Sequence, residues 1–169
     1  ELKNFVASKS KKLIIDLRGN PGGYLDTAIS VASYFIPEGD IIVSEDYGKN
    51  KEQDIYRSKG FTLLPKGIKV VVLVDGGSAS ASEIVAGALR EHNKATLIGT
   101  KTFGKGSVQE LVPVTKDTSL KITVAKWLTP KGNSISEKGL EPDIVVEYNK
   151  ESKTDVQLDR AVQFLKTGK

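Results

Sequence analysis

Two stretches of the sequence share one pattern: an apolar strand, a turn rich in glycine, and an amphipathic helix. In the first, the apolar residues of Lys12–Leu17 lead into the turn Arg18–Gly23, and Leu25–Phe35 then carries apolar residues at helical spacing. In the second, Val70–Val74 leads through Gly76–Ser80 into another helix. Because Val70–Val74 is apolar throughout, we expect a parallel strand covered on both faces. The alternation predicts an α/β fold with functional groups at the carboxyl ends of the strands.

The rest of the chain predicts shorter elements, and 169 residues suffice for one domain with a real core, which we assign to residues 1–169. Residues 46–69 are polar and predict a surface excursion with a weak strand near Ile55. The other expected elements are strands at Ile41–Ser44, Ala95–Ile98 and Ile144–Val146, an antiparallel pair at Val108–Val114 and Lys121–Leu128, and a C-terminal helix at Val156–Leu165.

Composition removes several kinds of chemistry. The chain has no cysteine and one histidine, so thiol nucleophiles, disulfides and metal sites built from cysteines or several histidines are excluded within it. The net charge of +4 comes from scattered lysines, most of them near an acidic residue, and does not predict nucleic-acid binding. No apolar run approaches the roughly 18 residues that span a membrane.

The turn after Val70–Val74 contains three serines, Ser78, Ser80 and Ser82, at the start of a helix. Free N–H groups at a helix N-terminus favour negative charge, which suits the oxyanion of acyl transfer. A structural interpretation competes, because Ser80 with Glu83 fits a capping box. The residues alone do not choose among the three serines.

A serine nucleophile needs a base. His92 follows Ser80 by 12 residues on the same helix, which places it about 18 Å from Ser80. That distance is too long for proton transfer, so His92 is excluded as the base. A lysine remains, and its neutral amine is favoured by burial. Lys105 lies between two glycines with no acidic neighbour before Glu110, so we expect it to be buried; Lys101 is the second candidate.

The same loop is close to a phosphate-binding P-loop, with Gly99 and Gly104-Lys105 at the right spacing. That motif requires serine or threonine directly after the lysine and then a helix. Here Gly106 follows, and the next residues predict a strand, so phosphate binding is disfavoured.

Four blocks together resemble the carboxy-terminal processing, or tail-specific, proteases of the S41 type. They occur in the order found in that family. The blocks are Asp16–Gly23, Gly77–Ile84, Lys101–Gln109 and Lys138–Asp143.

The resemblance implies a fold similar to the ClpP/crotonase class, with repeated strand-strand-helix units and a mixed sheet. It implies a Ser/Lys dyad in which Ser80 is the nucleophile, Lys105 the general base and Gln109 the residue that holds the lysine amine. The implied oxyanion-hole donors are the backbone N–H groups of Gly23 and Ala81, with Gly22 as a nearby alternative. No metal or other cofactor is implied.

The resemblance also implies the substrate, a polypeptide with an apolar C-terminus that is cut near that end, and a compartment, the bacterial envelope or a plastid lumen. Family members normally carry a PDZ domain and a long segment before this region, and neither is found in these 169 residues, which we interpret as a peptidase-domain fragment. Two other functions stay open: a non-catalytic peptide-binding module, and a crotonase-like enzyme acting on thioesters.

Overall fold

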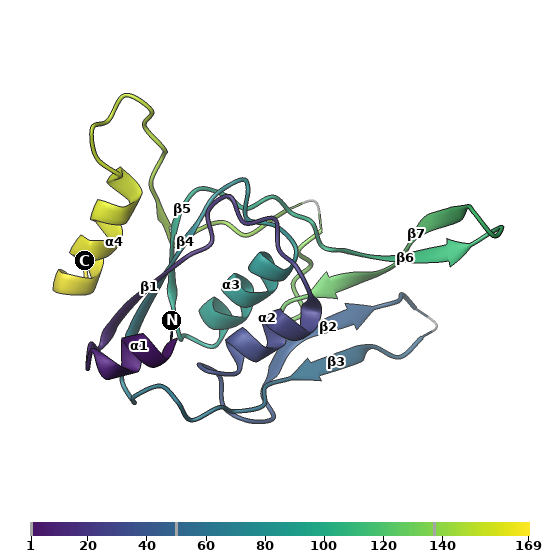
Figure 1. Cartoon of the computed structure of the whole chain (residues 1–169), viewed down its shortest axis with the longest axis horizontal. Coiled ribbons are helices and arrows are strands. Elements are labelled where there is room, and N and C mark those ends of the chain that lie inside the picture. Colours follow the sequence, from purple (N-terminus) through teal and green to yellow (C-terminus); the bar gives the residue numbers. More distant parts are fainter. Residues whose placement is uncertain (1, 50, 137) are drawn as a thin grey trace.

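The computed structural model describes residues 2–49, 51–136 and 138–169 and has an α/β architecture (Figure 1). The helices are α1 (Leu2–Ala7), α2 (Leu25–Ala32), α3 (Ala81–Glu91) and α4 (Val156–Thr167). The strands are β1 (Lys12–Asp16), β2 (Ile41–Asp46), β3 (Asp54–Arg57), β4 (Lys69–Val74), β5 (Thr96–Gly99), β6 (Ser107–Pro113), β7 (Ser119–Leu128) and β8 (Ile144–Val145).

The strands form two sheets. One has the order β1-β4-β5-β8, and all of its pairs are parallel; the other has the order β3-β2-β7-β6, and all of its pairs are antiparallel. The expected α/β class is therefore confirmed, as is the antiparallel pairing of β6 with β7. Parallel and antiparallel strands are, however, separated into two sheets.

The centre of the molecule is β4, whose residues alternate between two apolar clusters. Val70, Val72 and Val74 pack with α2 and α3, which lie between the two sheets, while Val71 and Leu73 pack with α4 on the opposite face. All five valine and leucine side chains are buried. The prediction that this strand is covered on both faces is confirmed, and the covering on both sides explains the uninterrupted apolar run.

Most element boundaries agree with the sequence prediction to within three residues, and two differences have physical causes. Helix α2 ends at Ala32 because the chain tightens there into turns that lead to Pro37: the Tyr34 N–H donates to the Val31 carbonyl at 3.2 Å and the Phe35 N–H to the Ala32 carbonyl at 2.9 Å. Helix α1 was not predicted, since it has only six residues and none of them is buried. No helix within the described residues combines the length and the apolar character needed to cross a bilayer.

The two glycine turns meet at the carboxyl edge of the parallel sheet. The Gly19 N–H donates to Asp75 Oδ1 at 2.8 Å, and the Ala79 N–H donates to the Asn20 carbonyl at 3.1 Å. Because β1 and β4 are adjacent and parallel, the turns after them emerge side by side. Segments about 60 residues apart in sequence thus form one surface.

Arg18, at the end of β1, ties this surface to α4. Its guanidinium donates to both carboxylate oxygens of Asp155 at 2.8 Å each, and to Asp16. Asp155 also caps α4, accepting from the Leu158 N–H at 3.0 Å. Hydrogen bonding to Arg18 is the chief reason that the pKa of Asp155 falls to about 2.

We predict that Asp155→Asn weakens the fold in a pH-dependent way, because asparagine still caps the helix but loses the ion pair. A carboxyl whose folded pKa is depressed stabilises the fold above its unfolded value, about 4, and the stabilisation is lost as pH falls toward 2. The side chain of Asp155 is 36% exposed, so screening limits the loss at pH 7 to about 1 kcal/mol.

Urea unfolding from pH 7 to pH 3 measures this effect. The difference between wild type and Asp155→Asn should narrow below pH 4, while Asp159→Asn, which removes an exposed carboxylate from the same helix, should match wild type at pH 7. A difference that stays constant across this range would contradict the prediction.

Candidate active site

Ser80 lies between β4 and α3 in a backbone conformation that few side chains adopt. Its φ is 57° and its ψ is −119°, a region that costs a non-glycine residue about 1–3 kcal/mol. Such strain is found where the surrounding structure holds a residue for function, as in the sharp strand-to-helix turns that expose nucleophilic serines.

The three serines of this turn have different surroundings. Ser78 is fully buried, and its hydroxyl donates to the Leu17 carbonyl at 2.8 Å and accepts from the Asp75 N–H at 3.0 Å. Ser82 is buried on α3. Ser80 is the one that is partly exposed. The alternatives that the residues left open are therefore separated by burial, in favour of Ser80.

The carboxylate of Glu83 joins this turn to the loop that carries the candidate bases. Glu83 is fully buried. Its Oε2 accepts from the backbone N–H groups of Ser80 and Lys105, both at 2.9 Å, and its Oε1 accepts from the Gly104 N–H at 2.8 Å and the Thr102 hydroxyl at 2.5 Å. Two bonds to one oxygen keep the backbone nitrogens of Ser80 and Lys105 within about 6 Å of each other.

The two candidate lysines differ in their contacts. Lys101 Nζ forms an ion pair with Glu141 at 2.8 Å, which occupies the amine. Within the described residues Lys105 has no such partner. The chain after Lys105 enters β6 rather than a helix, so the P-loop alternative has no structural support.

The expectation that Lys105 is buried is wrong. Lys105 is exposed, and its apolar neighbour Phe103 is 66% exposed. Gln109, on β6, is exposed as well, and among the described residues no hydrogen bond joins Lys105 to Gln109 or to the Ser80 hydroxyl. The fold thus brings the backbones of Ser80 and Lys105 together without joining their side chains.

The expected oxyanion-hole donors can be assessed from their hydrogen bonds. In the part of the chain that the structure describes, the N–H groups of Gly23 and Ala81 have no acceptor, whereas the Gly22 N–H donates to Asn20 Oδ1 at 2.9 Å. Gly22 has a φ of 97°, and a Cβ there would lie 2.8 Å from the Ala81 nitrogen. Gly22 therefore allows the two turns to approach, and Gly23 has the free donor.

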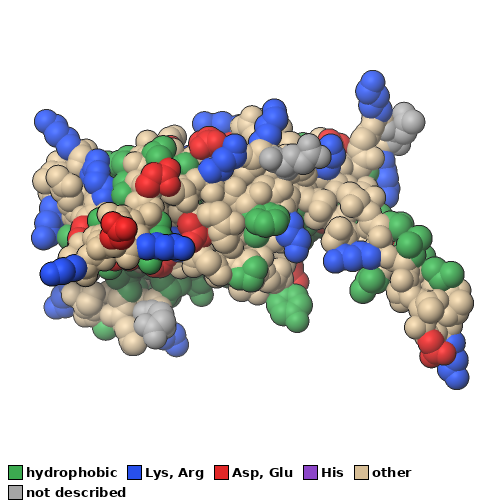
Figure 2. Space-filling view, turned by 90° about the horizontal axis from the view of Figure 1, so that it is seen from above, with side chains coloured by type: hydrophobic (Ala, Val, Ile, Leu, Met, Phe, Trp, Pro, Cys, Tyr) green, Lys and Arg blue, Asp and Glu red, His purple; other side chains and the backbone are tan. Residues whose placement is uncertain are grey.

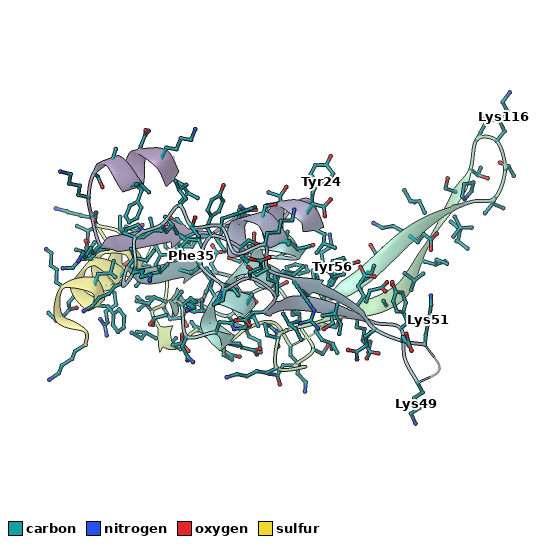
Figure 3. The ribbon with its side chains drawn as sticks, turned by 90° about the horizontal axis from the view of Figure 1, so that it is seen from below. Tyr24, Phe35, Lys49, Lys51, Tyr56 and Lys116 are labelled. Carbon is teal, nitrogen blue, oxygen red and sulfur yellow. The ribbon has the colours of Figure 1, made fainter. Side chains whose placement is uncertain are left out.

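A small apolar pocket opens beside these donors. Its volume is about 140 Å³, and its walls include Gly23, Ala81, Leu17, Val31 and Val85. The exposed side chain of Tyr24 lies at its rim and points away from the body (Figure 3). The pocket has room for a small aliphatic side chain next to two free N–H groups.

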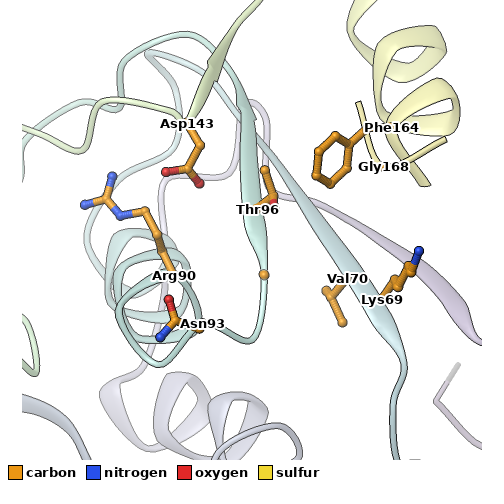
Figure 4. Close-up of a pocket in the computed structure, with 9 residues that line it drawn as sticks. Lys69, Val70, Arg90, Asn93, Thr96, Asp143, Phe164 and Gly168 are labelled. Carbon is orange, nitrogen blue, oxygen red and sulfur yellow. The ribbon is translucent and has the colours of Figure 1, made fainter. Parts of the chain in front are cut away.

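A larger cavity of about 460 Å³ lies elsewhere, between Thr96, Asp143, Arg90 and Phe164 (Figure 4). Its lining includes Lys69 at the start of β4, so it is at the opposite end of the parallel strands from Ser80. His92 is also distant, since it follows α3 at the end remote from Ser80. The described residues contain no group of three or more His, Asp and Glu side chains placed to hold a metal ion.

The segment that holds Ser80, these donors and the lysine loop lies within the part of the chain that a family model matches. The model of peptidase family S41 covers residues 1–146. The chain belongs to peptidase family S41. The resemblance seen in the four sequence blocks is therefore confirmed at the level of the family.

Individual relatives agree with this assignment. The carboxy-terminal-processing protease of Bartonella bacilliformis is 48% identical over 140 residues, 82% of this chain and 32% of that protein. A probable CtpA-like serine protease of Staphylococcus epidermidis is 42% identical over 89% of this chain and 31% of its own length. The structure of a photosystem II D1 C-terminal processing protease has a TM-score of 0.78 and 32% identity, covering 86% of this chain and 37% of that one. The chain thus spans about a third of the length of these relatives.

The sequence analysis missed the role of Glu83, which it considered only as part of a helix cap. One signal was available: Glu83 stands among small and apolar residues at the start of α3, where an acidic residue on the buried face requires partners. Those partners, Thr102 and Gly104, lie in another segment and could not be identified by local pattern.

We predict that Glu83→Gln destabilises the protein by about 2–4 kcal/mol, because an amide NH₂ would replace one acceptor oxygen and face backbone donors. Urea unfolding measures the loss, and hydrogen exchange should show faster exchange of the Gly104 and Lys105 amides. Glu110→Gln, at an exposed position on β6, is the matched control and should be neutral. Equal stability of Glu83→Gln and the control would refute the role assigned to this carboxylate.

Proposed function

We propose that this chain is the peptidase domain of a serine endopeptidase that cleaves polypeptides near their C-terminus, with Ser80 as nucleophile and Lys105 as general base. The observation that carries the proposal is the strained, partly exposed Ser80 beside the N–H groups of Gly23 and Ala81, which have no acceptor among the described residues. Membership of peptidase family S41 supports the reaction class.

In the proposed reaction, the neutral amine of Lys105 accepts the hydroxyl proton of Ser80, and Oγ attacks the peptide carbonyl carbon. The carbonyl oxygen becomes an oxyanion, which accepts hydrogen bonds from Gly23 and Ala81. Protonated Lys105 then donates its proton to the leaving amine, and the C–N bond breaks. Water repeats these steps on the acyl-enzyme, releasing the carboxylate and regenerating Ser80.

Desolvation favours the neutral form of a lysine amine, and the side chain of Lys105 is exposed. We propose that bound substrate supplies this desolvation, together with the regions of the longer relatives that lie outside this chain. Gln109 then orients the amine once the Lys105 side chain turns toward Ser80. The bond from the Lys105 N–H to Glu83 limits the movement to the side chain.

The proposed substrate is inferred from the pocket and the family. A volume of about 140 Å³ next to the oxyanion donors suits a small aliphatic side chain at the residue whose carbonyl is attacked. By their family, the substrates are polypeptides with apolar C-termini, and the compartment is the bacterial envelope or a plastid lumen. A PDZ domain in the parent protein is part of the same proposal.

The test of the dyad combines labelling with matched variants. A fluorophosphonate probe should modify Ser80, and Ser80→Ala should lose peptide cleavage by at least about 1,000-fold while Ser78→Ala still becomes labelled. Lys105→Arg should be equally inactive because guanidinium keeps its proton, whereas Lys101→Ala should retain activity. Labelling at Ser78, or substantial cleavage by Lys105→Arg, would overturn the assignment.

The oxyanion hole has its own test in two neighbouring glycines. Gly22→Ala should lower kcat by about 100-fold or more, because the new Cβ would lie against the Ala81 nitrogen and displace a donor. Gly23→Ala should stay close to wild type, since its Cβ would meet nothing within 4 Å and its N–H is retained. If both variants cleave a short peptide equally well, the proposed donor pair is wrong.

A further inference from the structure

The hairpin of β6 and β7 projects from the body of the molecule, with Lys116 at its tip (Figures 1 and 3). The two strands pair from Ser107 and Lys126 out to Pro113 and Ser119. In contrast, β7 pairs with β2 only over Lys126–Leu128. The outer part of the hairpin therefore has no further strand beside it in the described residues.

One face of this projecting part carries three apolar side chains together with Glu110. The register sets Val112 opposite Leu120 and Glu110 opposite Ile122, and residues directly opposite in an antiparallel pair share a face. We call Val112, Leu120 and Ile122 the hairpin face. Leu120 is 56% exposed and Ile122 is 37% exposed, and hydrophobic side chains are visible along the projection in Figure 2. Exposed apolar side chains gathered in this way mark a binding surface.

The strand that borders the hairpin face is also the edge of its sheet. In the order β3-β2-β7-β6, the outward N–H and C=O groups of β6 lack a strand partner among the described residues. Pro113 has no N–H and so ends this edge. The open length, Ser107–Val112, is about 20 Å, enough for a six-residue extended segment.

The direction of β6 relates this edge to the catalytic turn. The strand begins two residues after Lys105, whose N–H shares a Glu83 oxygen with Ser80, and it runs outward to the tip. A segment added antiparallel to β6 would run from the tip toward Ser80. Its N-terminal residues would lie along the hairpin, and its C-terminal end would reach the catalytic turn.

We propose that the β6 edge and the hairpin face bind the part of an extended polypeptide substrate that precedes the cleaved bond, by antiparallel strand addition. This inference rests on the proposed endopeptidase function. The main chain of the substrate pairs with Ser107–Val112, and apolar side chains at alternate positions pack against the hairpin face. A protein entering in this way presents its C-terminal residues to Ser80, which accounts for cleavage near that end.

A second copy of the chain is the main competing occupant. Edges that pair permanently are long and uncharged, whereas this one carries Glu110 and ends at Pro113. These features favour a transient partner, such as a substrate, over a stable continuous sheet.

The first test compares substrates that share one cleavage site and have either four or twelve residues before it. The longer substrate should have a kcat/KM about tenfold higher, and the double variant Leu120→Thr/Ile122→Thr should lose that advantage without affecting the shorter substrate. Val114→Thr is the matched control, because Val114 is 65% exposed on the same hairpin but lies beyond Pro113, where the open edge of β6 ends. Equal loss in the control and the double variant, or no loss in either, would overturn the inference.

The second test leaves the hairpin unchanged and measures binding to Ser80→Ala, so that it does not depend on cleavage. Fluorescent twelve-residue peptides carrying one N-methyl amide each should bind with affinities that alternate, since only every second amide faces β6. Uniform affinities would refute strand addition even if the wild type cleaves all peptides. Sedimentation that shows a dimer dissociated by the double variant would assign the hairpin face to a second copy instead.

Discussion

The buried carboxylate of Glu83 is the interaction on which the candidate active site depends. A charge without solvent contact is tolerated only when its oxygens are saturated by donors, and here four donors converge on it. One of these comes from the catalytic turn and three from the loop that leads to β6. Leaving any of these donors unpaired would cost free energy, so the four bonds fix the distance between the Ser80 turn and the loop that carries Lys105, which belong to different layers of the fold.

Those layers contribute different parts of the chemistry. The parallel sheet and its turns hold Ser80, Gly23 and Ala81, whose positions are set by buried packing around β4. The lysine loop leads instead into the antiparallel sheet, which it joins through the bond from the Trp127 N–H to the Gly106 carbonyl at 2.7 Å. In the proposed reaction, the turn that would bind the substrate carbonyl and the lysine that would act as base therefore adjust to each other through their side chains, while the backbones stay fixed.

Local patterns in the sequence were enough to predict the two strand–turn–helix units, the doubly covered β4 and the β6–β7 pair. Prediction failed where the outcome depends on contacts between distant segments. Lys105 is flanked in the sequence by glycines and is close to Phe103. Phe103 is itself exposed, so it does not bury the Lys105 side chain. Similarly, two adjacent glycines look interchangeable in sequence, and only contacts with distant segments separate them: Gly22 donates to Asn20 and lies against Ala81, whereas Gly23 does neither.

The backbone conformation of Ser80 also limits which residue types can occupy position 80. At a φ of 57° and a ψ of −119°, a second substituent on Cβ meets the adjacent backbone, so a β-branched residue is far less tolerable there than an unbranched one. Threonine, the nucleophile of other amide hydrolases, is thus barred from position 80 by geometry alone, although its hydroxyl differs little in reactivity. Cysteine is not branched at Cβ and so meets no such obstacle at this position.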